Sequence, residues 1–340
     1  MNEIHFSEIN DKVHVHLPDE RVIEAPRGTP IGKILKLVQP SYDAQIVGAI
    51  VNGSLRELTY KIDFESTVEP ISMSNPDGMR IYRRSLIMLL ETAFAMLHSQ
   101  ESIVIDHSVS FGGYFCRMAG KKQLSDLELA GLEQKMRSLV VDDLPIEKKV
   151  VALDDAIEYF RSKGHNDKVS LLQHRKKDYL VMYYLSGHGD YHHGYMVPST
   201  GMLKWFALEP AEGGFTLRFP RRQSPEEIVP LHNYPKLLAT FRQYGDWLEL
   251  LEIDSVGALN DAIAFGRIRE VVLVSEELHA LNIARIAEQI AQRKGEIRVV
   301  LVAGPSSSGK TTSSKRFSIQ LLAHGLQPFP LELDNYFVNR

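Results

Sequence analysis

A glycine-bounded loop near the C-terminal end of the 340-residue chain constrains the fold more than any other feature. Its sequence, GPSSSGKT at 304–311, matches the pattern G-x-x-x-x-G-K-[ST] completely. The β-branched run 297–303 precedes it, as in a buried parallel strand, and a helix-like stretch closed by Gly325 follows. Free backbone N–H groups and the helix dipole favour an anion at such a junction. The sequence predicts a phosphate-binding loop in a parallel α/β domain; the alternative is a serine–glycine turn before an ordinary helix.

Each residue type in this loop suits a phosphate-binding role. Glycines allow the backbone to approach the ligand closely, and the Lys310 ammonium supplies a point charge to the β- and γ-phosphates. The Thr311 hydroxyl suits Mg²⁺, so we expect ATP or GTP with Mg²⁺ as the cofactor. The expected nucleotide-binding residues are Gly304, Ser306, Ser307, Ser308, Gly309, Lys310, Thr311 and Thr312.

The end of the chain offers a candidate proton acceptor. The run 329–333 is a possible second strand, and Asp334 follows it, where ligands of doubly wound sheets bind. A carboxylate at this position could accept a proton from an attacking hydroxyl. The alternative is that Asp334 and Asn335 are turn residues that end a strand.

The first part of the chain, residues 1–75, has the pattern of a small β-grasp domain. Alternating and apolar runs at 13–17 and 21–25 predict two strands, and 29–38 predicts a helix with a proline at its first position. Two more strands are expected around the tight turn Asn52-Gly53.

Residues 76–225 predict a mixed α+β domain. An amphipathic helix is expected at 79–98, and Ser125 with Glu128 three residues later forms a capping-box pattern. Residues 226–295 predict a connecting region with two helices around a short strand, and 296–340 belong to the phosphate-loop domain. The fold class is therefore multidomain, α/β together with α+β.

Three resemblances follow from these segments. The first domain resembles the TGS domain of threonyl-tRNA synthetases, and the second resembles their editing-type domain. The C-terminal segment, with the loop followed by LELDNYFVNR, resembles the uridine kinase and phosphoribulokinase family. The order as a whole is similar to bacterial nucleoside kinases that carry a TGS domain.

The kinase resemblance implies ATP-dependent phosphoryl transfer to the 5′-hydroxyl of a nucleoside. It implies catalytic roles for Lys310 and Asp334, with Asp334 as the base, and nucleoside contacts from Tyr336 and Phe337. The remaining strands and the lid of such a kinase would follow Arg340, so we expect the chain to be an incomplete, poorly active kinase.

The editing chemistry of threonyl-tRNA synthetases does not carry over. Those domains use an H-x-x-x-H helix and a C-x-x-x-H segment on mischarged tRNA. The corresponding residues here are Arg84, Met88, His192 and Met196, so all four positions depart from the pattern.

A histidine-rich segment at 186–201 offers a separate possibility. In a strand, His188, Asp190 and His192 would share one face, and these are reasonable ligands for a metal ion such as zinc. The alternative is a polar surface loop, which the neighbouring glycines favour.

Composition limits the compartment and the partners. A formal charge of −4 argues against a dominant nucleic-acid surface, and the single cysteine, Cys116, cannot form an internal disulfide. No apolar run approaches the length of a membrane span, so we expect a cytoplasmic protein.

Two functions remain open. The first is the nucleoside kinase, which the aspartate and the two aromatic residues at the chain's end favour. The second is a regulatory module without catalysis, in which the first two domains recognise tRNA or a nucleotide. Under either function, RNA or a small molecule is a possible effector of these domains.

Overall fold

The computed structural model describes residues 11–109, 112–121, 123–230 and 235–336. The chain divides into two compact units, of which the first contains Met1–Asn166 and Arg175–Asp246. The second contains Asp167–His174 and Trp247–Arg340. The finer boundaries at 75, 225 and 295 stay predictions.

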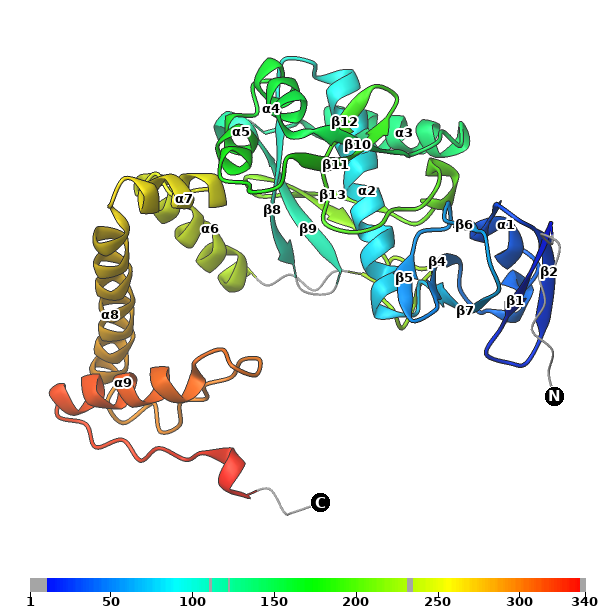
Figure 1. Cartoon of the computed structure of the whole chain (residues 1–340). Helices are drawn as coiled ribbons and strands as arrows, with labels where there is room; N and C mark the ends of the chain where they lie inside the picture. The colour runs from blue at the N-terminus through cyan, green and yellow to red at the C-terminus, as the bar shows by residue number, and fades with distance from the viewer. Residues whose placement is uncertain (1–10, 110–111, 122, 231–234, 337–340) are drawn as a thin grey trace. The chain divides into compact units, whose positions relative to one another are not determined.

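The first unit begins with the predicted strand–strand–helix–strand–strand order (Figure 1). Its five-stranded sheet has the order β2-β1-β7-β4-β5, with β1 and β7 parallel and the other neighbours antiparallel. The strands are β1 (Lys12–His16), β2 (Val22–Pro26), β4 (Ile46–Val51), β5 (Ser54–Arg56) and β7 (Ser66–Ser72).

Helix α1 (Ile31–Leu35) buries Ile31, Ile34 and Leu35 in the apolar core of this sheet. It is shorter than the predicted 29–38: β3 (Thr29–Pro30) pairs with β6 (Lys61–Ile62) before it, and residues 36–38 form a turn after it. The turn between β4 and β5 is the predicted one, and its residues Asn52 and Gly53 both have positive φ, as a two-residue hairpin turn requires.

Two further sheets and the helices α2, α3 and α4 build the second domain of this unit. The four-stranded sheet has the order β13-β14-β9-β8, and the three-stranded sheet has the order β10-β11-β12. The strands are β8 (Ile103–Val109), β9 (Gly113–Met118), β10 (Glu147–Ala152), β11 (Tyr179–Leu185), β12 (His188–Asp190), β13 (Ala207–Ala211) and β14 (Gly214–Arg218). The helices are α2 (Pro76–Leu97), α3 (Asp126–Val141) and α4 (Leu153–Ser162).

Helix α2 is the centre of this domain. The Asn75 side chain accepts a hydrogen bond from the Asp77 N–H and caps the helix, and Pro76 fills its first position. Its buried side chains join residues of both sheets and of α3 in a single apolar cluster. The predicted capping box at the start of α3 is present, because Ser125 and Glu128 bond each other's backbone N–H groups.

The second unit is helical. Three α-helices lie entirely within it: α7 (Val256–Ala264), α8 (Ile268–Gln292) and α9 (Lys310–Ala323). Two others, α5 (Asn166–Gln173) and α6 (Pro235–Leu250), belong partly to each unit. Ser170 of α5 donates to an Asp261 carboxylate oxygen of α7 at 2.6 Å, and His174 lies 2.8 Å from the other oxygen.

Three predicted strands of the C-terminal part are wrong. Residues 235–336, all described, contain no strand. The run 271–274 lies inside α8, while 297–303 and 329–332 are irregular and Leu333 begins a 3-10 helix (Leu333–Tyr336). Strands need partners for their backbone groups, and these two segments do not pair with each other. The predicted parallel α/β arrangement is therefore not formed in the described residues.

As for membranes, none of the described helices combines the length and the apolar character needed to cross a bilayer.

Gly78 provides a test of how α2 packs on the first sheet. A Cβ at this position would lie well inside contact distance of the Ser72 carbonyl oxygen and 3.2 Å from Val47. We expect Gly78→Ala to lower the free energy of unfolding by about 1–3 kcal/mol, through overpacking against backbone. Chemical denaturation measures it.

Gly131→Ala is the matched control, because Gly131 lies in helix α3 with nothing within 4 Å of its added Cβ. Alanine should there raise stability by about 0.5–1 kcal/mol. Equal changes in the free energy of unfolding for Gly78→Ala and Gly131→Ala would contradict the close packing of α2 against the Ser72 carbonyl.

Candidate functional site

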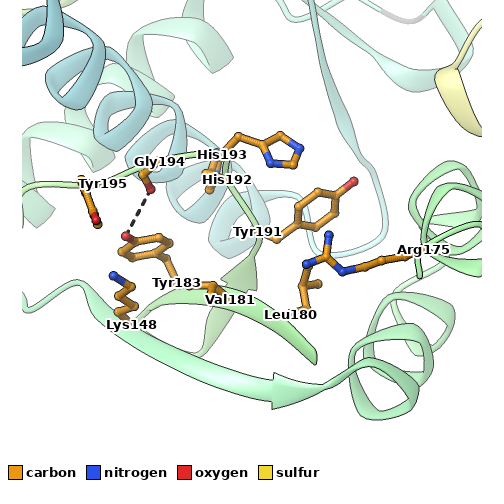
Figure 2. Close-up of a pocket in the computed structure, with 10 residues that line it drawn as sticks. All are labelled: Lys148, Arg175, Leu180, Val181, Tyr183, Tyr191, His192, His193, Gly194 and Tyr195. Carbon is orange, nitrogen blue, oxygen red and sulfur yellow. Dashed lines mark hydrogen bonds between the residues drawn. The ribbon is translucent and has the colours of Figure 1, made fainter. Parts of the chain in front are cut away.

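The first unit contains a pocket of about 370 Å³ beside the β11–β12 hairpin (Figure 2). Strands β10 and β11 form one side, and the segment after β12 forms the other. The lining residues are Lys148, Arg175, Leu180, Val181, Tyr183, Tyr191, His192, His193, Gly194 and Tyr195.

The pocket combines cationic and aromatic side chains. Figure 2 draws Lys148 with Tyr183 and Tyr195 at one end and Arg175 with Tyr191 at the other. The Lys148 ammonium lies 4.8 Å from the centre of the Tyr195 ring and 5.9 Å from that of Tyr183. Arg175 donates to the Tyr179 carbonyl at 3.1 Å, which orients its guanidinium. Rings beside cations suit a ligand that has a flat apolar part and a negative charge.

Glu57 connects the β-grasp domain to this pocket. One of its carboxylate oxygens lies 3.1 Å from the Lys148 ammonium, and the other lies 3.0 Å from the Tyr183 hydroxyl. The same hydroxyl lies 3.2 Å from the Gly194 carbonyl oxygen. Burial, with a further contribution from Glu57, raises the pKa of Tyr183 far above its usual value. Tyr183 is therefore a hydrogen-bond donor at neutral pH and not a base.

Helix α2 holds the loop that closes the pocket. Arg84 donates to the Tyr195 carbonyl at 2.7 Å, and the Ser85 hydroxyl accepts from the Val197 N–H at 2.9 Å. Burial lowers the pKa of Arg84, whose guanidinium nevertheless stays charged. Gly194 has a φ of 124°, and a Cβ there would lie 2.7 Å from the Arg84 guanidinium carbon. A glycine is thus required for this approach.

The four positions that depart from the editing pattern lie around this loop. Met88 and Met196 are buried in the same apolar cluster, with 0% and 2% exposure. Arg84 binds the loop backbone, and the His192 ring lies 3.8 Å from the Glu91 carboxylate. Thioethers in an apolar core cannot transfer protons, so Met88 and Met196 shape the site without supplying acid–base chemistry.

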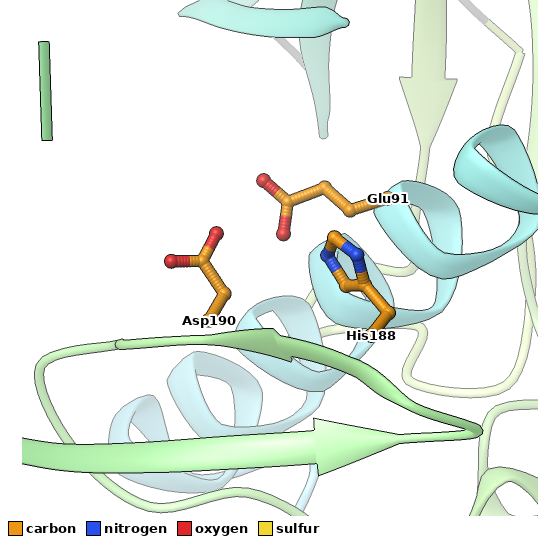
Figure 3. Close-up of side chains that lie close together, drawn as sticks. All are labelled: Glu91, His188 and Asp190. Carbon is orange, nitrogen blue, oxygen red and sulfur yellow. The ribbon is translucent and has the colours of Figure 1, made fainter. Parts of the chain in front are cut away.

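The metal-ligand set predicted from the sequence is only partly brought together. His188 and Asp190 do share one face of β12, but the third member of the group is Glu91, on α2 (Figure 3). Potential ligand atoms of Glu91, His188 and Asp190 all lie within 4.8 Å of one another. His192 lies beyond the end of β12, and its ring is 3.8 Å from the Glu91 carboxylate. The sequence signal for Glu91 was its position as the sole acidic residue of α2 after Asp77.

In the second unit, the phosphate-loop segment forms a turn before a helix. Gly309, in the left-handed region at φ 79°, precedes Lys310, the first residue of α9. The Lys310 ammonium donates to the Pro305 carbonyl at 2.7 Å across the loop. Gly304, Thr311, Thr312 and the three serines 306–308 are exposed.

The residues predicted to bind and deprotonate the nucleoside do not follow a strand, as the sequence had suggested. Asp334 and Tyr336 belong to a 3-10 helix (Leu333–Tyr336), not to a strand end, and Tyr336 is 71% exposed. Phe337 lies outside the described residues. The ligand contacts predicted for Gly304–Thr312, Asp334 and Tyr336, with ATP or GTP and Mg²⁺, are not tested by these findings and stay predictions.

The known proteins that this chain resembles in sequence are threonine–tRNA ligases. No family model matches the chain. A threonine–tRNA ligase of Francisella tularensis subsp. novicida is 25% identical over 240 residues, which cover 71% of this chain and 37% of the ligase. Threonine–tRNA ligase 2 of Bacillus subtilis is 26% identical over 204 residues, covering 60% of this chain and 32% of the ligase. The chain therefore matches about a third of the length of these relatives.

These relatives confirm the resemblance to threonyl-tRNA synthetases and overturn the kinase prediction. They are threonine–tRNA ligases, not nucleoside kinases, so the predicted transfer to a nucleoside 5′-hydroxyl is wrong. The structure gives a physical reason, because the parallel sheet on which that prediction depended is not formed in residues 296–336.

The buried methionines lead to a prediction about hydrolysis. With Met88 and Met196 where the editing pattern has histidines, the chain should not accelerate deacylation of a mischarged tRNA. Release of a radiolabelled aminoacyl group should proceed at the same rate with and without the protein. Acceleration that disappears in His192→Ala would show instead that His192 is a working base.

Proposed function

We propose that this chain is a tRNA-binding regulatory module that performs no chemistry on the tRNA. The pocket beside the β11–β12 hairpin receives the single-stranded 3′ end, and the β-grasp domain contributes through Glu57. The observation that carries this proposal is the pocket, lined by cations and tyrosines, in the part of the chain that is similar to threonine–tRNA ligases.

The chemistry of the pocket supports an RNA end as the ligand. Proteins recognise single-stranded RNA by stacking unpaired bases on aromatic rings and by placing cations near the phosphates. Tyr191 and Tyr195 supply rings on the loop side, while Lys148 and Arg175 supply positive charge on the strand side. Each stacked base contributes about 1–3 kcal/mol to binding.

The same residues argue against catalysis. Tyr183 keeps its proton because its pKa is raised, and Arg84 is engaged with the loop backbone. Met88 and Met196 are apolar core residues. The site thus retains shape and charge without a general base among these positions, and this combination fits a domain that senses tRNA.

Lys148 offers the sharpest test of tRNA binding. Loss of one charge-assisted phosphate contact should weaken binding by about tenfold. It should also reduce the slope of log K against log salt by about 0.7, the value for one phosphate of a single strand. Fluorescence anisotropy with labelled tRNA measures both in Lys148→Ala.

Lys149→Ala is the matched control, since Lys149 is the next residue of β10, lies 2.8 Å from Glu147 and does not line the pocket. It should bind tRNA as the unaltered chain does. A second experiment uses tRNA that lacks its 3′-terminal nucleotides. This tRNA should bind weakly to the unaltered chain and to both lysine variants. Equal weakening by both lysine substitutions, or tight binding of trimmed tRNA, would refute the proposed pocket.

A further inference from the structure

A compact group of three potential metal ligands lies outside the lining of the pocket. We infer that Glu91, His188 and Asp190 form a binding site for a divalent transition-metal ion, with Zn²⁺ the best fit. His192 lies outside this group, and its ring is 3.8 Å from the Glu91 carboxylate, which it can orient.

The geometry of the group suits a metal of this class. An imidazole nitrogen and two carboxylate oxygens lie within 4.8 Å of one another, which is the separation that ligands around one ion require. Mixed histidine and carboxylate sets bind Zn²⁺ at about 2.0–2.2 Å. Ca²⁺ and Mg²⁺ prefer all-oxygen sets, so the imidazole disfavours them.

The charges of the group also favour a cation. Asp190 is 3% exposed and the Glu91 side chain 15% exposed, so two carboxylates lie close together with little water around them. Two carboxylates this close are more stable as charged groups when a cationic partner lies beside them. A divalent ion would neutralise both charges at once, while His188 can coordinate it as a neutral ligand.

Two rigid elements place the ligands before any ion arrives. His188 and Asp190 flank Gly189, and β12 pairs with β11 in the register Leu185↔His188 and Tyr183↔Asp190. A Cβ at Gly189 would lie 2.6 Å from the Tyr184 ring, so only glycine allows this pairing. The Gly189 N–H also donates to the Tyr159 hydroxyl at 2.8 Å. Figure 3 shows both β12 side chains turned toward Glu91 on α2.

The test uses the full chain stripped with EDTA and then dialysed against Zn²⁺. Elemental analysis should find one tightly held equivalent, and Tm should rise by about 5 °C or more. Glu91→Gln and Asp190→Asn preserve side-chain shape and remove one ligand charge each. Each should weaken Zn²⁺ binding by about tenfold or more, measured by competition with a chelator of known affinity.

His193→Ala is the control, because His193 is an exposed neighbour outside the group, and it should bind Zn²⁺ normally. Stability gives a second readout. Glu91→Gln should lower the free energy of unfolding by less in EDTA than in Zn²⁺, because the bound ion adds stability to the unaltered chain that the variant largely loses.

Two results would overturn the inference. One is the absence of Zn²⁺ binding by the unaltered chain, or equal binding by Glu91→Gln, Asp190→Asn and His193→Ala. The other is a Glu91→Gln variant that loses stability equally with and without Zn²⁺, which would identify the group as an ion pair or a shared proton. These readouts do not involve tRNA, so they stand or fall separately from the tRNA-binding proposal.

Discussion

The first unit depends on helix α2, which runs through its second domain as a buried, rigid axis. Gly78 at its start packs against the Ser72 carbonyl of the β-grasp sheet. Two turns later Arg84 and Ser85 hold the loop that closes the pocket, and after two more turns Glu91 faces β12. Because a helix fixes the spacing of its residues, a single element sets the distance between the first sheet, the pocket and the acidic group.

Four positions on this framework, Arg84, Met88, His192 and Met196, differ from the editing pattern of threonyl-tRNA synthetases. The guanidinium of Arg84 approaches the backbone at Gly194 and Tyr195, where it acts as a structural donor. Met88 and Met196 belong to the same apolar cluster, so apolar packing as well as hydrogen bonds holds the loop against α2. A site with methionines at these two positions can still discriminate by shape, charge and stacking, which is what binding a nucleic-acid end requires.

Local patterns in the sequence predicted local structure well. The capping box at Ser125, the Asn52-Gly53 turn and the β-grasp order are all present, because each depends on residues close together in the chain. The failures concern long-range partners. The runs 271–274 and 297–303 have strand-like composition, but in the first case a continuous helix forms and in the second no neighbouring strand pairs. β-propensity describes fit to a sheet and cannot create one.

The candidate sites show the same limit. Period-two alternation correctly placed His188 and Asp190 on one face, since that depends only on strand geometry. Glu91 could not be found in this way, because it reaches the group from α2, nearly a hundred residues earlier in the chain. The pocket was missed for a similar reason, as Lys148, Arg175 and the 191–195 segment meet only after β10 and β11 pair.

The two proposed sites share the segment that follows β12, and this has a thermodynamic consequence. His192 lines the pocket and lies 3.8 Å from Glu91, so its ring position is common to both. Arg84 and Tyr159 already fix the backbone on either side of it, through Tyr195 and Gly189. Little ordering is left for a ligand to impose, which favours binding at each site separately. Coupling between them must then act through the His192 side chain, and by linkage any effect of the metal on tRNA affinity equals the effect of tRNA on metal affinity.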